Sequence, residues 1–353
     1  MGYHVFDFFP LFEGARAALL ASPLGIFVNG LGALHVFFVL SGYVLALSLT
    51  HDTRPGKIAR FYVRRVFRIH PPYVMGVLFA WAMTLGLERV ATGALKISAS
   101  ASCFHLPSSL LPRALMLPSL AFGQLPVGWS LFVELAMSVI FPLMLWLSRR
   151  THPGVLVALG FVLLRPIDNR LGFLVFTLDF ALGIAVFLAP PQIGRFFASL
   201  SRSATAALVA ATIVLLQAPY AVSWWNTGES GMHARYAPSM IMPLALGAAL
   251  LVVATVHQPA IRRFFAARWI ASLGEISFSF YLIHFTVLTW IVCNFTGHSL
   301  SVPAAIGIGL VAFAISVGLS IVGYRLVEVP SMNAGRAVGR AIATWSTRTP
   351  KGA

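Results

Sequence analysis

Apolar residues fall in long runs along the chain, and most polar residues gather in the stretches between those runs. An α-helix of about 20 apolar residues is long enough to cross a bilayer, and the pattern shows neither strand alternation nor heptads. The sequence therefore predicts an all-α, polytopic transmembrane helical bundle. The predicted spans are residues 31–50, 73–91, 130–148, 154–164, 171–189, 204–222, 240–257, 276–294 and 303–324.

The first residues, "MGYHVFDFF", have the character of the end of a hydrophobic helix but are too few to cross a membrane. They lack the basic region and small-residue cleavage site of a signal peptide. We therefore expect a first span that is truncated in this chain, for about nine to ten spans in all. A short re-entrant or interfacial segment is the alternative interpretation.

Composition and charge support a membrane protein without a separate soluble domain. Of the 353 residues, 58% are hydrophobic and 10% are charged, whereas soluble domains average about a quarter charged. Residues 1–330 are predicted to form one transmembrane domain, and residues 331–353 a basic cytoplasmic tail. The net charge of +15 does not require nucleic acid, because most of the 25 lysines and arginines lie in alternate loops and the tail, which marks those parts as cytoplasmic.

The two cysteines, Cys103 and Cys293, both fall toward the outer side in this topology. A disulfide is chemically permitted there, and two unpaired cysteines are the alternative. No clustered spacing of cysteine and histidine suggests a bound metal. We therefore predict no metal site.

An arginine stripe stands at the start of the second span, in "RFYVRRVFRIHPPY". Arg60, Arg64 and Arg68 recur every four residues and share one helical face, with Arg65 beside them. Pro71-Pro72 is expected to break the helix before the next span. Such a cluster can simply hold topology and touch anionic lipid, or its guanidinium groups can bind the phosphates of a cytosolic coenzyme.

Ionisable side chains inside the spans are costly unless paired or hydrated, so each is a candidate for function. Glu134, in "VGWSLFVELAMSVIFPL", is either a structural partner of an arginine or backbone donor, or a group for binding or proton transfer. His284, in "LGEISFSFYLIHFTVL", is either hydrogen-bonded structure or catalytic, with Ser277 and Tyr281 close in sequence. In "YRLVEVP", Glu328 is expected to pair with Arg325.

Five segments, in order, resemble motifs of the acyltransferase 3 family of integral-membrane acyltransferases, which includes bacterial O-antigen and other polysaccharide O-acetylases. They are "FFVLSGYVLA", "RRVFRIHPPY", "WSLFVE", "ISFSFYLIH" and "YRLVEVP". The resemblance runs from about Phe37 to Pro330. It implies that "FFVLSGY" belongs to the catalytic membrane domain, where Ser41-Gly42 allows a bend or a close helix contact.

The resemblance implies transfer of an acyl group, with acetyl expected, from cytosolic acyl-CoA to a hydroxyl of a carbohydrate or glycolipid. Arg65 and Arg68, helped by Arg64, would hold the CoA phosphates. The location implied is a bacterial-type inner (cell) membrane, where the reaction would modify polysaccharide at the cell envelope. A transporter of a glycan or small substrate, and a noncatalytic scaffold or sensor on the same fold, are the alternatives.

The sequence departs from the family at the expected catalytic base, a histidine that follows an arginine by eleven positions. The counterpart here is His4, but the arginine would lie before Met1, and Arg16 has Phe27 at the required distance. His35 stands where the family often has aspartate. This predicts either a misassigned start or a truncated, inactive member.

The resemblance therefore implies that His4 acts as general base or as transient acyl acceptor. Glu134 would orient that histidine or bind the acceptor. Ser277, Tyr281 and His284 are expected to support the cavity.

Overall fold

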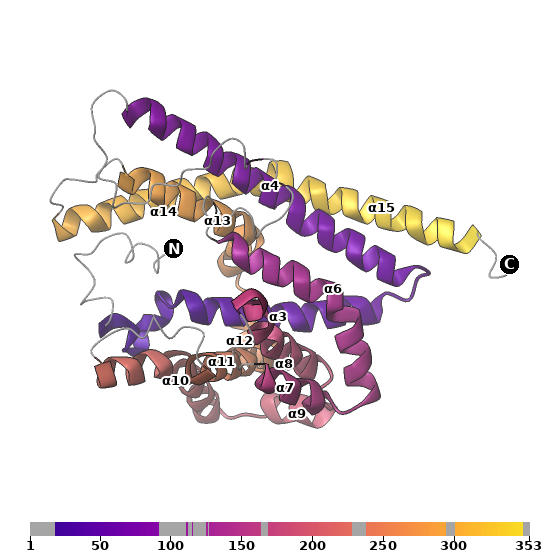
Figure 1. Cartoon of the computed structure of the whole chain (residues 1–353). Coiled ribbons are helices and arrows are strands. Elements are labelled where there is room, and N and C mark those ends of the chain that lie inside the picture. Colours follow the sequence, from indigo (N-terminus) through magenta and orange to yellow (C-terminus); the bar gives the residue numbers. More distant parts are fainter. Residues whose placement is uncertain are drawn as a thin grey trace.

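The computed structural model describes residues 18–91, 111, 115, 125, 127–163, 169–227, 238–293 and 301–348, and every regular element within them is a helix (Figure 1). The first helices in chain order are η2 (Pro23–Phe27), α3 (Gly30–His51), α4 (Lys57–Ala91), α6 (Gly128–Arg150), α7 (Pro153–Val162), η5 (Asn169–Phe176), α8 (Thr177–Phe187) and α9 (Pro191–Ala198). The others are α10 (Arg202–Thr227), α11 (Pro238–His257), α12 (Pro259–Phe265), α13 (Arg268–Cys293), α14 (Val302–Gly323), η7 (Tyr324–Glu328) and α15 (Val329–Arg348).

Each predicted span falls on a helix, which confirms the all-α fold class. In the described part of the chain, six helices are long and apolar enough to cross a membrane, or seven if the bent pair 173–187 and 191–198 counts as one span. α4 is not among them, and α7 is a shorter apolar helix of ten residues. The expected count of nine to ten spans is therefore not confirmed.

The helix break expected at Pro71-Pro72 is wrong, because α4 continues through both prolines as one helix of 35 residues. Two prolines remove two backbone donors and normally interrupt a helix. Here Ile69, Tyr73 and Val77 are buried on both sides of the prolines in one apolar cluster with residues of α6 and α13. Tertiary packing thus holds α4 together where the local sequence favours a break.

The residues predicted as a basic tail form most of α15, which lies along the arginine-rich part of α4 (Figure 1). A Cβ added at Gly335 would lie 2.7 Å from the Cβ of Phe67, and Gly56 faces Ser346. These contacts make the two helices antiparallel. α15 therefore covers one side of the arginine stripe.

Helices α3 and α8 run parallel and touch backbone to backbone. A Cβ added at Gly42 would lie 2.5 Å from the carbonyl oxygen of Phe180, and one added at Gly183 would overlap the carbonyl oxygen of Val39. The close helix contact expected at Ser41-Gly42 is thus confirmed at Gly42. Phe38, Phe176 and Phe180 are buried beside this crossing, and the ring of Phe38 makes tilted contacts with the other two.

We predict that Gly183→Ala destabilises the bundle, because backbone atoms on both sides of the new methyl group cannot move without separating α3 from α8. Overpacking of this kind costs about 1–3 kcal/mol, so the apparent Tm in detergent should fall by several degrees. Gly307→Ala on α14 is the matched control, since no atom lies within 4 Å of the added Cβ. Equal Tm values for the two variants would contradict the crossing.

Candidate active site

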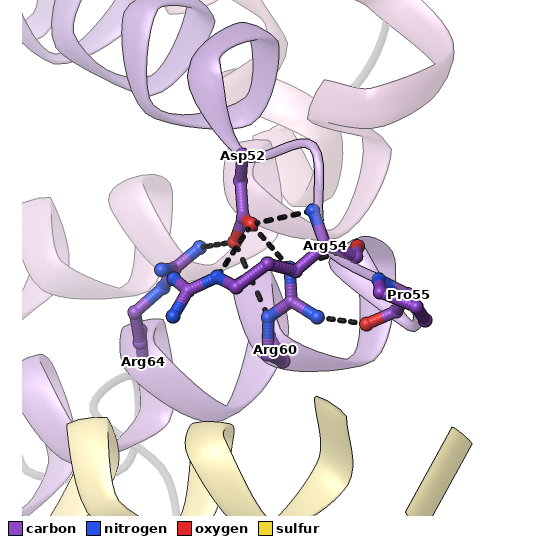
Figure 2. A network of polar contacts seen from close by, with 5 residues as sticks. All are labelled: Asp52, Arg54, Pro55, Arg60 and Arg64. Atoms are coloured by element: carbon purple, nitrogen blue, oxygen red, sulfur yellow. Dashed lines mark hydrogen bonds and ion pairs between the residues drawn. The ribbon is translucent and has the colours of Figure 1, made fainter. Parts of the chain in front are cut away.

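Asp52, directly after α3, binds three arginines at the end of the bundle where α3 leads into α4 (Figure 2). Arg60 and Arg64 form ion pairs with its two carboxylate oxygens, the latter at 2.8 Å, and Arg54 adds a third at 3.3 Å. The guanidinium of Arg60 also donates to the carbonyl oxygens of Pro55 and Arg54. Arg60 is only 1% exposed, so its charge is satisfied entirely within this cluster.

The arginines determine the charge state of Asp52. Burial by itself would raise the pKa of this carboxyl, but hydrogen bonds from Arg60, Arg64 and Arg54 outweigh burial and lower the pKa from 3.8 to about 2. Asp52 is therefore ionised throughout the physiological range. It neutralises part of the arginine stripe that the sequence suggested for coenzyme binding.

Arg65 points away from this cluster and pairs with Glu134 of α6. Its guanidinium also donates to Ser138 Oγ at 3.1 Å, and the side chains of Arg65 and Glu134 are 11% and 5% exposed. Of the two interpretations of Glu134, the structure therefore shows the ion pair with an arginine. A catalytic role for the same carboxylate remains a proposal.

Two further polar contacts join α6 to α13 and α13 to η7. Ser130, one turn before Glu134 on α6, hydrogen bonds to Tyr281 of α13 at 2.6 Å, and Glu134 lies within electrostatic range of Tyr281. Ser279 of α13 donates to the buried Glu328 of η7 at 2.8 Å, and Arg68 of α4 interacts electrostatically with Glu328. The expected pair of Arg325 with Glu328 is not among the ion pairs of the described residues.

These contacts lead from α4 to α6, then to α13, then to η7 and back to α4. We call the set the polar ring; its members are Arg65, Arg68, Ser130, Glu134, Ser279, Tyr281 and Glu328. η7 is a π-helix, a departure from α geometry that is frequent at functional sites. The polar ring therefore joins residues from four of the five motif segments.

A separate buried pair joins α3 to α8. His35 Nδ1 lies 2.7 Å from Asp179 Oδ1, and both side chains are 0% exposed. Sequence analysis noted His35 only as a departure from the family and did not single out Asp179. The one available signal was an aspartate inside an apolar run, in "FTLDFALG".

The other predicted site residues are dispersed. His284 is buried, with Nδ1 2.9 Å from the carbonyl oxygen of Phe280, whereas Ser277 is exposed and donates to the carbonyl oxygen of Gly274. Arg64 is partly exposed, and Arg68 is exposed beside Met332. His4 and Cys103 lie outside the described residues. Within those residues, no group of three or more His, Cys, Asp or Glu could hold a metal ion.

These features define an all-helical integral membrane protein with ionised side chains paired inside its bundle. The profile of the acyltransferase 3 family, described as an acyltransferase domain, matches residues 1–325 of the 353, so the chain belongs to that family. The family makes it a membrane acyltransferase. Neither the curated proteins nor the solved structures include a match to the chain.

We predict that Asp52→Asn lowers stability by about 3 kcal/mol at neutral pH, because Arg60 would remain buried without its counter-charge. The pKa of Asp52 is lower in the folded chain, so its stabilisation is present above about pH 4 and is lost as pH falls toward about 2. The difference in apparent Tm between wild type and variant should therefore shrink by about half between pH 5 and pH 3. Glu275→Gln, an exposed carboxylate, is the control and should show no such trend.

We also predict that Arg65 and Glu134 are energetically coupled. Arg65→Gln and Glu134→Gln should each cost about 3 kcal/mol, since each leaves one buried charge without its partner. The double variant should lose less than the sum of the two, as measured by unfolding in detergent. Additive losses of unfolding free energy would show that the interaction between Arg65 and Glu134 does not contribute to stability.

Proposed function

We propose that this membrane acyltransferase moves an acyl group, with acetyl the expected one, from cytosolic acyl-CoA to a hydroxyl of a carbohydrate or glycoconjugate at the cell envelope. The proposal places it in a bacterial-type inner membrane with its C-terminus in the cytoplasm. The observation that carries it is the polar ring, in which the segments that resemble family motifs converge. A ring of this kind would position the reacting groups inside an otherwise apolar bundle.

The arginines differ in what they can offer a coenzyme. Arg60 is buried, the side chain of Arg65 is only 11% exposed, and both have acidic partners, so neither is available to a new anion without losing one. Arg64 is 29% exposed, and Arg68 is exposed at the same side of α4. In this proposal Arg68, helped by Arg64, holds the CoA phosphates, while Arg65 keeps Glu134 in place.

The reaction requires a base for the attacking hydroxyl. The hydroxyl oxygen attacks the thioester carbon, the carbon–sulfur bond breaks, and the hydroxyl proton passes to the base and then to the CoA thiolate. The proposed group is His4, as general base or as transient acyl acceptor. Glu134 would orient that histidine or bind the acceptor, and Tyr281 and His284 would support the cavity.

We predict that membranes containing the protein transfer label from radiolabelled acetyl-CoA to membrane glycans. His4→Ala should abolish the transfer without affecting membrane insertion. Membranes that label no more than those of the empty vector, despite normal insertion of the protein, would contradict the proposed function.

Arg68→Gln should raise the KM for acetyl-CoA about tenfold and leave kcat nearly unchanged, because a charge-assisted bond to phosphate is worth about 1.5–3 kcal/mol. The matched control is Arg262→Gln on α12, an exposed arginine away from α4, which should leave the KM unchanged. Equal KM values for the two variants would remove Arg68 from the coenzyme site.

A further inference from the structure

The buried pair of His35 and Asp179 has hydrogen-bonding capacity that the protein does not use. Among the residues that the structure describes, His35 Nε2 and Asp179 Oδ2 have no hydrogen-bond partner, although both side chains are 0% exposed. A buried polar atom left unpaired costs about 1–3 kcal/mol, and in a native structure it requires an explanation. Two such atoms on one His–Asp pair form a position suited to a small polar group.

The chemistry of the two atoms restricts that group. With a neutral imidazole whose Nδ1 donates to Asp179, both open atoms are acceptors, so the ligand must bring a donor. With a protonated imidazole, Nε2 becomes a donor while the carboxylate oxygen stays an acceptor. A hydroxyl both donates and accepts, and so complements either state. An acyl carbonyl accepts only and cannot complement the neutral state.

The pair lies toward the end of the bundle away from the arginine stripe. His35 is in the second turn of α3 and Asp179 in the first turn of α8. Asp52 is 17 residues beyond His35, about 25 Å along the helix. Phe176 contacts His35 at 5.7 Å between ring centroids and Trp129 at 5.6 Å, and the partly buried Trp129 starts α6. Phe176 therefore packs between His35 and Trp129 at that end.

We propose that His35 and Asp179 form the acceptor site of the enzyme, where the hydroxyl of the carbohydrate binds and gives up its proton. This inference rests on the proposed acyl transfer and deepens it. Of the two roles proposed for His4, this leaves that of transient acyl acceptor, because His35 is the base: His35 Nε2 takes the proton as the hydroxyl oxygen bonds to the acyl carbon. The proton then passes to the leaving group, which is the CoA thiolate in direct transfer or the imidazole of His4 once it has given up the acyl group, so that the pair returns to its starting state.

In this arrangement His35 is a catalytic residue, and Asp179 is a positioning residue that fixes the imidazole tautomer and stabilises the imidazolium. The alternative is that the pair only ties α3 to α8. The two cases differ in kinetics. A general base contributes roughly 10²–10⁴-fold to the rate of transfer without affecting acyl-CoA binding. A structural tie affects the amount of folded protein and not the rate per folded molecule.

The test compares His35→Gln and Asp179→Asn with wild type in membranes, with radiolabelled acetyl-CoA as donor and the membrane glycans as acceptor. His35→Gln should lower kcat per folded molecule at least 100-fold, and Asp179→Asn at least tenfold. Neither should change the KM for acetyl-CoA, opposite to the pattern expected of Arg68→Gln. Thr286→Val is the matched control, since Thr286 Oγ1 is also buried without a partner in the described part of the chain, and it should transfer normally.

Each outcome decides the question. Wild-type rates in His35→Gln, with wild type active, would overturn the acceptor site and leave the proposed function intact. Failure of both variants to fold while Thr286→Val folds would mark the pair as a structural tie, and would also overturn it. Wild-type membranes that label no glycan would remove the proposed function, and this inference with it.

Discussion

The ion pair of Arg65 with Glu134 is the constraint on which the arrangement of the candidate site depends. Either charge alone inside an apolar bundle would cost several kcal/mol, so α4 and α6 are favoured only in the register that brings the two together. Once that register is set, Ser130 meets Tyr281 and α13 is positioned in turn. The site is thus held together by polar side chains for which lipid offers no other hydrogen-bond or ion-pair partner.

The arginines of the stripe also require partners where they are buried, and they therefore have different roles. Asp52 satisfies the buried Arg60 and shares its charge with Arg64, while Arg65 pairs with Glu134 of α6. Only toward Arg68 does the stripe offer exposed positive charge. The sequence pattern suggests one uniform phosphate-binding site. In the folded chain, most of its arginines are instead paired with carboxylates, and only the part around Arg68 is exposed for binding.

Sequence patterns predicted the helices well, because long apolar runs are a strong and local signal. They failed at Pro71-Pro72, where packing of α4 against α6 and α13 overrides the local preference. They anticipated an arginine partner for Glu134 but missed the acidic partners Asp52 and Asp179. Asp179 lies 144 residues from His35, and only the contact of α3 with α8 brings the two together.

The family resemblance, by contrast, was confirmed over most of the chain. Its expected base, His4, lies outside the described residues, so its role stays a prediction. The motif residues that the structure does describe converge for a reason that the sequence alone does not show. Each buried charge among them requires a partner on another helix.

In the proposed reaction, the phosphates of acyl-CoA bind at the arginine end of the bundle and the acceptor hydroxyl approaches from the opposite end. The most direct test uses sealed vesicles of known orientation that contain the protein, with radiolabelled acetyl-CoA added outside. The account predicts labelled glycan in inside-out vesicles, protected from added glycan hydrolases until the membrane is opened, and none in sealed right-side-out vesicles. Equal labelling in both orientations, or label accessible on the face that received acetyl-CoA, would contradict it.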